Sequence, residues 1–229
     1  ENTHIITKEH LTEDGKDTKI GTTKRGNGPA YRDKYDRTGK RAKDIPELSE
    51  YVVDLYEELH VKTPDSKVLF EGAQGFGLDI DWGDYPFVTS SHCTTAGALL
   101  NGIPPQSIRR VFGVAKAYDT YVGSKRFHGY GEIFDKIQEE GSEFGATTGR
   151  PRQCNWLNIE NLRRSIDING VTDLVINKVD ILRKVGTWGI KTGPVTINFD
   201  SEDRWKSYIE NNFNVEAVNL TFSESPERI

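Results

Sequence analysis

Strand-like runs of apolar residues alternate with helix-like segments along most of this chain, and this alternation constrains its fold more than any other feature. It is typical of an α/β domain in which helices flank a mostly parallel sheet. The predicted strands span residues 68–70, 111–115, 174–176, 195–199 and 215–220, and the predicted helices span residues 46–59, residues 202–212 and a segment after residue 152 with Leu157, Leu162 and Ile166 on its inner face.

Length, charge and cysteine content exclude several classes of protein. At 229 residues the chain is one domain or one large piece of one. Its net charge of −5 argues against a nucleic-acid or membrane-surface protein, because no basic face dominates. No apolar run approaches the length of a membrane span. The two cysteines, Cys93 and Cys154, form no disulfide framework and fit a reducing cytoplasm.

A short polar segment, residues 177–180 (Asn-Lys-Val-Asp), directly follows a predicted strand. Ligands of open α/β sheets gather at the carboxyl ends of strands, where this segment is expected. The carboxylate of Asp180 can accept both the N1–H and the 2-amino group of guanine, a donor pattern that adenine lacks, and the stem of Lys178 can cover the ring. The segment indicates guanine binding, with an ordinary loop salt bridge as the alternative.

Residues 145–152 (Gly-Ala-Thr-Thr-Gly-Arg-Pro-Arg), called the arginine loop below, combine features of an anion site. The two glycines allow a tight turn and a close approach of a ligand to the backbone. Arg150 and Arg152, separated by a stiff proline, offer planar forks that match carboxylates and phosphates. The loop is therefore predicted to close on a small polyanion, and the alternative is a solvated basic turn before a helix.

Three further segments carry groups that suit phosphate binding. Residues 71–75 follow a predicted strand, and their glycines allow a ligand close to the backbone while Gln74 offers hydrogen bonds. Residues 85–91 end in three hydroxyl side chains, which hold a phosphate or cap a helix. Residues 21–23 with Arg25 form a second anion-friendly stretch, or simply a solvated charged loop.

Acid–base and metal chemistry are less clearly indicated. Asp79 and Asp81 can pair as acid and base, although solvated carboxylates at a strand edge are the more ordinary explanation of this spacing. The five histidines show no metal-ligand spacing, and the neighbours His92 and Cys93 are better explained by packing. No metal ligand is therefore assigned within the chain.

Together these motifs resemble the adenylosuccinate synthetase family, which joins aspartate to inosine monophosphate (IMP) at the expense of GTP. The resemblance runs in order from Gly21 to Arg228. It rests on the matching segments 21–31, 70–75, 85–91, 116–118, 143–150 and 177–180.

The resemblance implies three sets of ligand-binding residues. The IMP-binding set is Thr23, Arg37, Gln74, Thr89 and Arg150. The aspartate-binding set is Ala146, Thr147, Thr148, Gly149, Arg150 and Arg152. The GTP-binding set is Arg152, Lys178, Val179, Asp180, Ser223, Glu224 and Ser225.

The resemblance also implies a P-loop-NTPase-like fold, a cytoplasmic role in AMP synthesis and Mg²⁺ as cofactor. Arg37 matches an arginine that reaches the nucleotide of the partner subunit, so a homodimer is expected. Nucleic acid and membrane are not expected partners.

The chain departs from the family pattern in its first part. The glycine-rich phosphate loop with a catalytic Asp, and the later segment with a catalytic His, are not found in it. Residues 1–229 are therefore expected to be the middle and C-terminal part of a single family domain, with most Mg²⁺ ligands in the absent segment. No catalytic residue is identified in the chain itself, and Gln74 is expected only to orient the purine base.

Three alternatives remain open. A phage-type relative acts on 2′-deoxyguanylate, but the intact segments 21–26 and 145–150 favour IMP. A GTP-dependent switch also carries an Asn-Lys-x-Asp segment, but the Gly-x-x-x-x-Gly-Lys-Ser/Thr run of such proteins is absent from the sequence. The third alternative is a non-catalytic binding remnant.

Overall fold

The computed structural model describes residues 1–62, 65–146, 148–213 and 218–224. The chain divides into two compact units, Glu1–Ser107 and Ile108–Ile229. Within the described residues, all extended strands of the two sheets lie in the second unit. Each unit is considered by itself.

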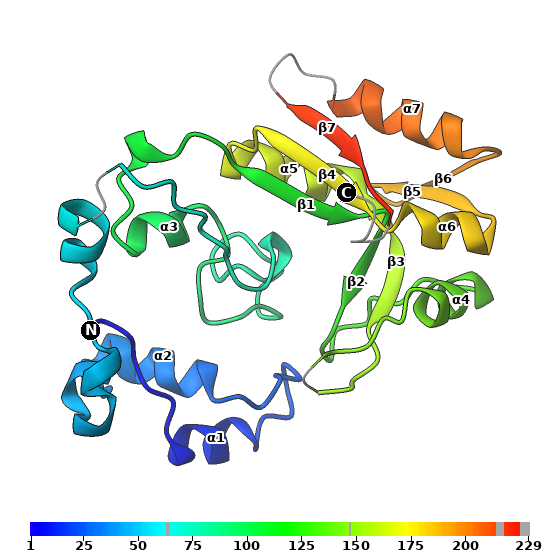
Figure 1. The fold of residues 1–229 in the computed structure, drawn as a ribbon. Helices are drawn as coiled ribbons and strands as arrows, with labels where there is room; N and C mark the ends of the chain where they lie inside the picture. Colours follow the sequence, from blue (N-terminus) through cyan, green and yellow to red (C-terminus); the bar gives the residue numbers. More distant parts are fainter. Residues whose placement is uncertain (63–64, 147, 214–217, 225–229) are drawn as a thin grey trace. The chain divides into compact units, whose positions relative to one another are not determined.

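A parallel sheet of three strands forms the centre of the second unit, in the order β1-β4-β7. Its register pairs Phe112 with Asp173 and Asp173 with Asn219, so the three strands begin level, and β7 ends one residue before the other two. Figure 1 shows the three arrows pointing the same way, which brings their carboxyl ends to one edge of the sheet. The strands are β1 (Phe112–Lys116), β4 (Asp173–Asn177) and β7 (Asn219–Phe222).

A second sheet has four strands in the order β2-β3-β5-β6 and is mixed. Its outer pairs, β2 with β3 and β5 with β6, are antiparallel, whereas β3 and β5 are parallel. The strands are β2 (Tyr118–Tyr121), β3 (Gln153–Asn158), β5 (Trp188–Thr192) and β6 (Val195–Phe199).

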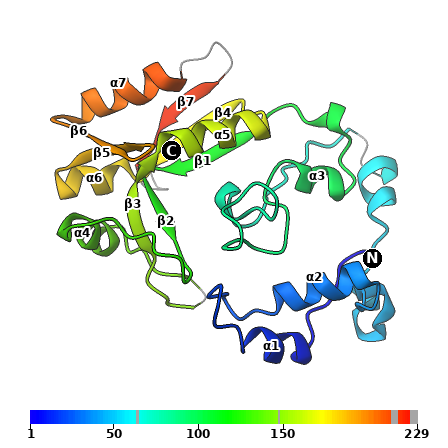
Figure 2. The same ribbon diagram turned by 180° about the vertical axis from the view of Figure 1, so that it is seen from behind.

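Four helices in the described part of the second unit pack on these sheets. Asn158 begins α5, because its side chain accepts hydrogen bonds from the backbone N–H groups of Glu160 and Asn161. Gly170 ends the same helix in a left-handed conformation. Figure 2 shows the helices from behind, with α4 beside the β2–β3 pair. The helices are α4 (Glu132–Glu140), α5 (Ile159–Asn169), α6 (Val179–Val185) and α7 (Glu202–Phe213).

One apolar core joins the sheets and helices of the second unit. Trp205 of α7 is fully buried and lies 5.4 Å, centroid to centroid, from the ring of Trp188 in β5. Ile176 of β4 and Ile190 of β5 are also fully buried, so both sheets contribute to the same cluster. This continuous core fixes the ends of the strands that carry the polar motifs.

The first unit consists of short helices and loops. The Nε2 atom of His10 lies 2.9 Å from a carboxylate oxygen of Asp33, and this contact ties the first two helices together. The helices are α1 (Lys8–Asp14), α2 (Asn27–Asp36) and α3 (Ala96–Leu100). Shorter 3₁₀ turns span Ala42–Asp44, Pro46–Tyr51, Phe76–Leu78 and Pro105–Ser107, and a π-helical turn spans Glu57–Lys62.

The α/β class predicted from the sequence is confirmed, with parallel pairing in the β1-β4-β7 sheet. The strands expected at 111–115, 174–176 and 195–199 and the helix expected at 202–212 are present within a residue or two. No helix in the described part of the chain is long and apolar enough to cross a membrane.

Two predicted elements of the first unit are wrong. The expected continuous helix at 46–59 is broken: a 3₁₀ turn spans Pro46–Tyr51, residues 52–54 are not helical, and helical turns resume at residue 55. None of its apolar side chains is fully buried, and a helix without a buried face gains little from packing. The expected buried strand at 68–70 has no hydrogen-bonded neighbour among the described residues, and Leu69 is 86% exposed. A strand needs such a neighbour to satisfy its backbone.

Two smaller expectations of the second unit also need correction. Leu157 lies on β3 and not on the following helix, whose inner face carries Leu162 and Ile166. The last strand begins at Asn219, later than predicted. Residues 214–217, on which part of that prediction falls, lie outside the described residues.

Candidate functional site

A buried carboxylate, Glu143, gathers side chains from several predicted motifs of the second unit. Its Oε2 atom accepts hydrogen bonds from Nζ of Lys116 and from Nη1 of Arg152, each at 2.7 Å. Its Oε1 atom accepts a 2.7 Å hydrogen bond from the hydroxyl of Tyr118 and lies 3.2 Å from Nζ of Lys178. The side chain of Glu143 is 0% exposed, so these partners replace water completely.

The charges of this cluster, Glu143 with Lys116, Arg152 and Lys178, do not cancel. Burial by itself would raise the pKa of Glu143, but the hydrogen bonds from Lys116, Tyr118 and Arg152 lower it to about 2, so the carboxylate is ionised at neutral pH. Three cations then face one anion, which leaves an excess of two positive charges. Burial lowers the pKa of Lys116, and the charges of Arg152 and Lys178 add to that effect. Such a cluster attracts a polyanion.

The arginine loop is a tight turn whose end enters this cluster. The N–H of Gly149 donates to the carbonyl of Gly145 at 2.8 Å, and the N–H of Gly145 donates to the carbonyl of Arg150 at 2.9 Å. Gly149 has φ +64°, a conformation that glycine adopts without strain. A Cβ atom on Gly145 would lie 2.6 Å from Oγ1 of Thr148. The glycines are thus required by the turn, as the sequence predicted.

The loop does not precede a helix, which was the alternative explanation; it leads into β3. Arg152 contacts Glu143 through both its side chain and its backbone, because its backbone N–H donates to the carbonyl of Glu143 at 2.9 Å. Arg150 and Thr148 are partly buried, whereas Ala146 and Gly149 are exposed. Thr147 lies outside the described residues.

The 177–180 segment turns from β4 into α6. Lys178 has φ +60° at the first turn of the helix, and its Nζ donates to the carbonyl of Gly141 at 2.6 Å in addition to its contact with Glu143. The ammonium is thus held over the end of α4, which the sequence did not predict. Asp180 is partly buried in the first turn of α6. The Oδ1 atom of Asn177 is buried, and no hydrogen-bond partner is found for it among the described residues.

The segment after β7 lies beside this turn. The N–H of Val179 donates to the carbonyl of Ser223 at 3.4 Å, and the N–H of Ser223 donates to the carbonyl of Ile176 at 2.8 Å. The carboxylate of Glu224 accepts a 2.6 Å hydrogen bond from Arg183 of α6. The structure therefore brings together most of the predicted GTP set, and Ser225 lies outside the described residues.

In the first unit, two carboxylates hold the loop that carries Thr23. Asp17 accepts hydrogen bonds from the N–H groups of Gly21 and Thr22 at 2.8 and 3.2 Å. Asp14 accepts from the N–H of Gly26 at 2.7 Å and from the hydroxyl of Thr22 at 2.8 Å. These backbone N–H groups serve the loop itself, so an anion here would contact exposed side chains such as Thr23.

The remaining predicted residues of the first unit lie on separate loops. Arg37 is exposed at the end of α2 with φ +64°. Gln74 is exposed with φ +59°, and its Oε1 atom lies 4.0 Å from the sulfur of Cys93. Thr89 is partly buried, and its hydroxyl lies 3.5 Å from that of Ser91.

Asp79 and Asp81 do not form an acid–base pair. Asp79 is fully buried, and its carboxylate accepts hydrogen bonds from the N–H groups of Asp81, Trp82 and Cys93. Nδ1 of His92 lies 3.4 Å from the carboxylate of Asp81. Asp79, Asp81 and His92 are close enough for a metal ion, yet the oxygens of Asp79 are occupied in organising the loop.

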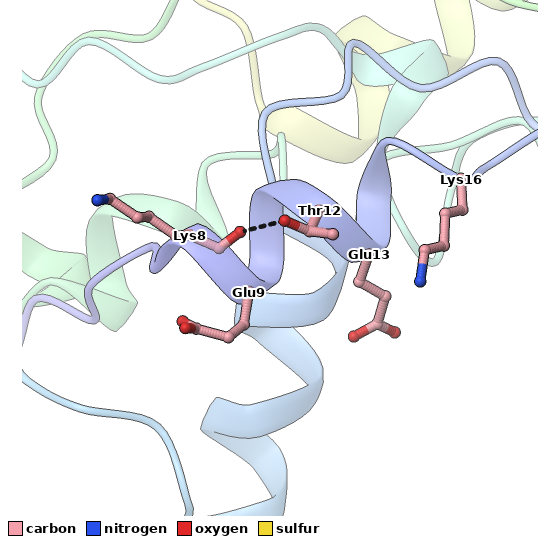
Figure 3. A pocket seen from close by; sticks show the side chains of 5 residues that line it. All are labelled: Lys8, Glu9, Thr12, Glu13 and Lys16. Carbon is pink, nitrogen blue, oxygen red and sulfur yellow. Dashed lines mark hydrogen bonds between the residues drawn. The ribbon is translucent and has the colours of Figure 1, made fainter.

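A shallow pocket lies on an exposed face of α1. Figure 3 shows its lining side chains, with the hydroxyl of Thr12 donating to the carbonyl of Lys8 at 2.9 Å. None of the predicted site residues lines it. The lining residues are Lys8, Glu9, Thr12, Glu13 and Lys16.

Sequence reasoning missed the roles of Glu143, Lys116 and Tyr118 in the cluster. All three stand in matched motif segments, yet none was assigned a role. A signal was present: a glutamate two residues before a loop rich in arginine, and a lysine directly after a predicted strand. The contact between them joins residues 27 positions apart, which local patterns do not show.

Comparisons with known proteins identify the family to which the chain belongs. The family model described as adenylosuccinate synthetase matches residues 1–48 and 45–224. A curated adenylosuccinate synthetase of Salinibacter ruber is 37% identical over 85% of this chain and 56% of its own length. One of Brugia malayi is 36% identical over 87% of this chain and 57% of its own length. The chain thus spans little more than half the length of these relatives.

Two solved structures share the fold. Fully ligated adenylosuccinate synthetase of Plasmodium falciparum has a TM-score of 0.78 at 24% identity, over 96% of this chain and 74% of that one. Succinoaminodeoxyadenylate synthetase of cyanophage S-2L, bound to dGMP and dATP, has a TM-score of 0.72 at 21% identity, over 96% of this chain and 63% of that one.

Proposed function

Because the chain belongs to the adenylosuccinate synthetase family, we propose that the protein that contains it ligates L-aspartate to IMP in a GTP-driven step of AMP synthesis. The observation that carries this proposal is the Glu143 cluster, in which one carboxylate faces Lys116, Arg152 and Lys178. Its excess positive charge lies where β1 and β4 end, beside the 177–180 turn. A nucleoside triphosphate fits both features, since it combines a polyanion with a base.

The guanine base is assigned to the 177–180 turn. Asp180 would accept the N1–H and the 2-amino group, while the adjoining Lys178, Val179, Ser223, Glu224 and Ser225 would enclose the base. The backbone hydrogen bond between Val179 and Ser223 supports this assignment, because it keeps the two segments side by side. Arg152 would face the phosphates from the cluster.

Aspartate is assigned to the arginine loop. Residues 146–149 would contact its carboxylates through backbone N–H groups and hydroxyls, and Arg150 and Arg152 would form charged hydrogen bonds with them. The exposure of Ala146 and Gly149 supports this role, because a small ligand can approach the loop there.

IMP is assigned to Thr23, Arg37, Gln74, Thr89 and Arg150. In this proposal Arg37 acts across the interface of a homodimer, and its exposed position at the end of α2 supports that role. We also place the reaction in the cytoplasm, which fits two cysteines that form no disulfide.

The chemistry has two steps. A base removes the N1 proton of the purine, and the resulting 6-oxyanion takes the γ-phosphoryl group of GTP, releasing GDP. The aspartate amine then attacks C6 and displaces the phosphate, which carries away the former 6-oxygen. Both steps move negative charge, which the cations of the cluster neutralise without rearranging. Gln74 would orient the base, and the proton-transferring Asp and His implied by the family are not assigned to residues of this chain.

Mg²⁺ does not fit the candidate ligands described here. The carboxylate of Glu143 is occupied by cations and by Tyr118, and the oxygens of Asp79 are occupied by backbone N–H groups. Mg²⁺ prefers several oxygen ligands in octahedral geometry, which neither carboxylate is placed to supply. Mg²⁺ thus stays a prediction from the family, and no step is routed through it.

The proposal is tested with the complete gene product that contains this chain. Adenylosuccinate should form only when IMP, aspartate, GTP and Mg²⁺ are all present. Asp180→Asn should weaken the binding of GTP and strengthen the binding of xanthosine triphosphate, because the 2-oxygen of xanthine accepts a hydrogen bond from the new amide. Equal rates with ATP would contradict the guanine assignment, and faster turnover of 2′-deoxyguanylate than of IMP would assign the chain to the phage-type reaction.

A further inference from the structure

We propose that Glu143 is a positioning residue that couples aspartate binding in the arginine loop to GTP binding at the 177–180 turn. This inference rests on the proposed function and deepens it. Arg152 comes from the loop, and Lys178 comes from the turn. The two side chains contact the same carboxylate, at 2.7 and 3.2 Å. Neither segment can therefore shift without disturbing the bond that holds the other.

The carboxylate is fixed in place from three sides. The N–H of Glu143 donates to the carbonyl of Gln138 at the end of α4, and its carbonyl accepts from the N–H of Arg152, each at 2.9 Å. The hydroxyl of Tyr118, on β2, donates to its Oε1 atom. A Cβ atom on Gly141 would lie 2.3 Å from that hydroxyl, so the backbone is packed closely against it. A side chain held this firmly transmits a displacement instead of absorbing it.

The bonds that Glu143 makes leave its partners able to contact ligands. A guanidinium has five N–H donors, and the contact of Arg152 with Glu143 uses one of them. Without the carboxylate charge, Lys116, Arg152 and Lys178 would repel one another across a few ångströms. The loop and the turn would then separate, and the arginine would lose the orientation in which it meets an anion.

The distinguishing measurement is the coupling between the two ligands. The Kd of a fluorescent, non-hydrolysable GTP analogue is measured with and without saturating aspartate, using the complete gene product. The wild type should bind the analogue about fivefold or more tightly when aspartate is present. In Glu143→Gln, which keeps the size but loses the charge, that ratio should fall close to one, and the KM of aspartate should rise about tenfold or more.

A second carboxylate variant and a matched control separate this role from a general loss of structure. Glu143→Asp keeps the charge but is one methylene shorter, so it should retain part of the coupling. Asp173→Asn removes another buried carboxylate at the opposite end of β4, where Arg110 and Asn219 hold it. It should lower the Tm while leaving the coupling ratio and the KM of aspartate unchanged.

The outcomes distinguish this inference from the proposed function. If the wild type does not make adenylosuccinate, both the proposed function and the inference that rests on it are contradicted. An active wild type whose coupling ratio is unchanged in Glu143→Gln would overturn the inference alone, and so would Glu143→Asp losing as much coupling as Glu143→Gln. Loss of coupling in Asp173→Asn as well would show that the effect follows stability and not Glu143.

Discussion

At the scale of single residues, charge determines what the second unit can bind. Glu143 is ionised and buried, and its partners supply more positive charge than it neutralises. The sequence identified Arg152 and Lys178 as separate motif residues, but it did not predict that they share a partner. Ion-pair partners distant in sequence cannot be read from spacing, because only the fold decides which strand ends meet.

The acid stability of the protein should depend on Glu143. Its pKa is lowered to about 2 in the folded protein from an ordinary value of 4.5. Its contribution to the free energy of unfolding, on the order of 3 kcal/mol, should be complete above pH ~4.5 and be lost as the pH falls toward 2. Urea unfolding of the wild type and Glu143→Gln, measured between pH 7 and 3, should show converging stabilities. A constant difference across this range would contradict the assignment.

Arg150 should matter most for aspartate. Arg150→Leu removes a planar, charged donor from the arginine loop and should raise the KM of aspartate by an amount equivalent to roughly 2–5 kcal/mol. Steady-state kinetics of the complete gene product measure this, with Arg204→Leu, an exposed arginine paired with Asp200 on the surface, as the control. An unchanged KM of aspartate in Arg150→Leu would make the loop purely structural.

At the scale of elements, the sequence pattern predicted the helices and strands that depend mainly on residues close together in the chain. Strands β1, β4 and β6 and helix α7 were predicted because each carries an apolar run or a helical period, although only the run of β4 is mostly buried among the three strands. The apolar spacing at 46–59 predicted one continuous helix that does not form, because none of its apolar side chains is fully buried. The run at 68–70 misled because hydrogen-bonded pairing, which decides a strand, is not local. The four-stranded mixed sheet was not predicted for the same reason.

The start of α5 offers a test at this scale. Asn158 accepts hydrogen bonds from two backbone N–H groups, at 3.1 and 3.0 Å. Asn158→Ala should therefore lower the free energy of unfolding by about 1 kcal/mol. Asn161→Ala, an exposed residue in the same first turn, should change it by less than about 0.5 kcal/mol. Equal effects in chemical denaturation would show that the side chain of Asn158 does not act as the helix cap.

At the scale of the whole molecule, two compact units carry different parts of the proposed site. The residues proposed to bind guanine and aspartate lie in the second unit, and most of those proposed to bind IMP lie in the first. The assignment of these residues to their ligands comes from the order of the motifs along the chain, because that order matches the family. Packing energetics could not have supplied it, since Thr23, Arg37 and Gln74 are exposed and make little contact with any core.

Arg37 provides the test of assembly. If it reaches the nucleotide of the partner subunit, Arg37→Leu and Arg150→Leu should each be nearly inactive alone in the complete gene product. Mixing them should restore activity, because a hybrid dimer contains one site with both arginines intact. The restored rate is followed against mixing ratio after dissociation and reassociation. No restoration at any ratio would place Arg37 in the site of its own subunit.

The most direct test of the central claim, that this chain belongs to a GTP-driven ligase acting on IMP, is the fate of the 6-oxygen. IMP labelled with ¹⁸O at that position is converted by the complete gene product with aspartate and GTP, and the inorganic phosphate is examined by mass spectrometry. We expect one ¹⁸O atom in each phosphate released, because the 6-oxyanion takes the γ-phosphoryl group before the aspartate amine displaces it. Unlabelled phosphate, with the ¹⁸O released into water or retained on the purine, would contradict the claim.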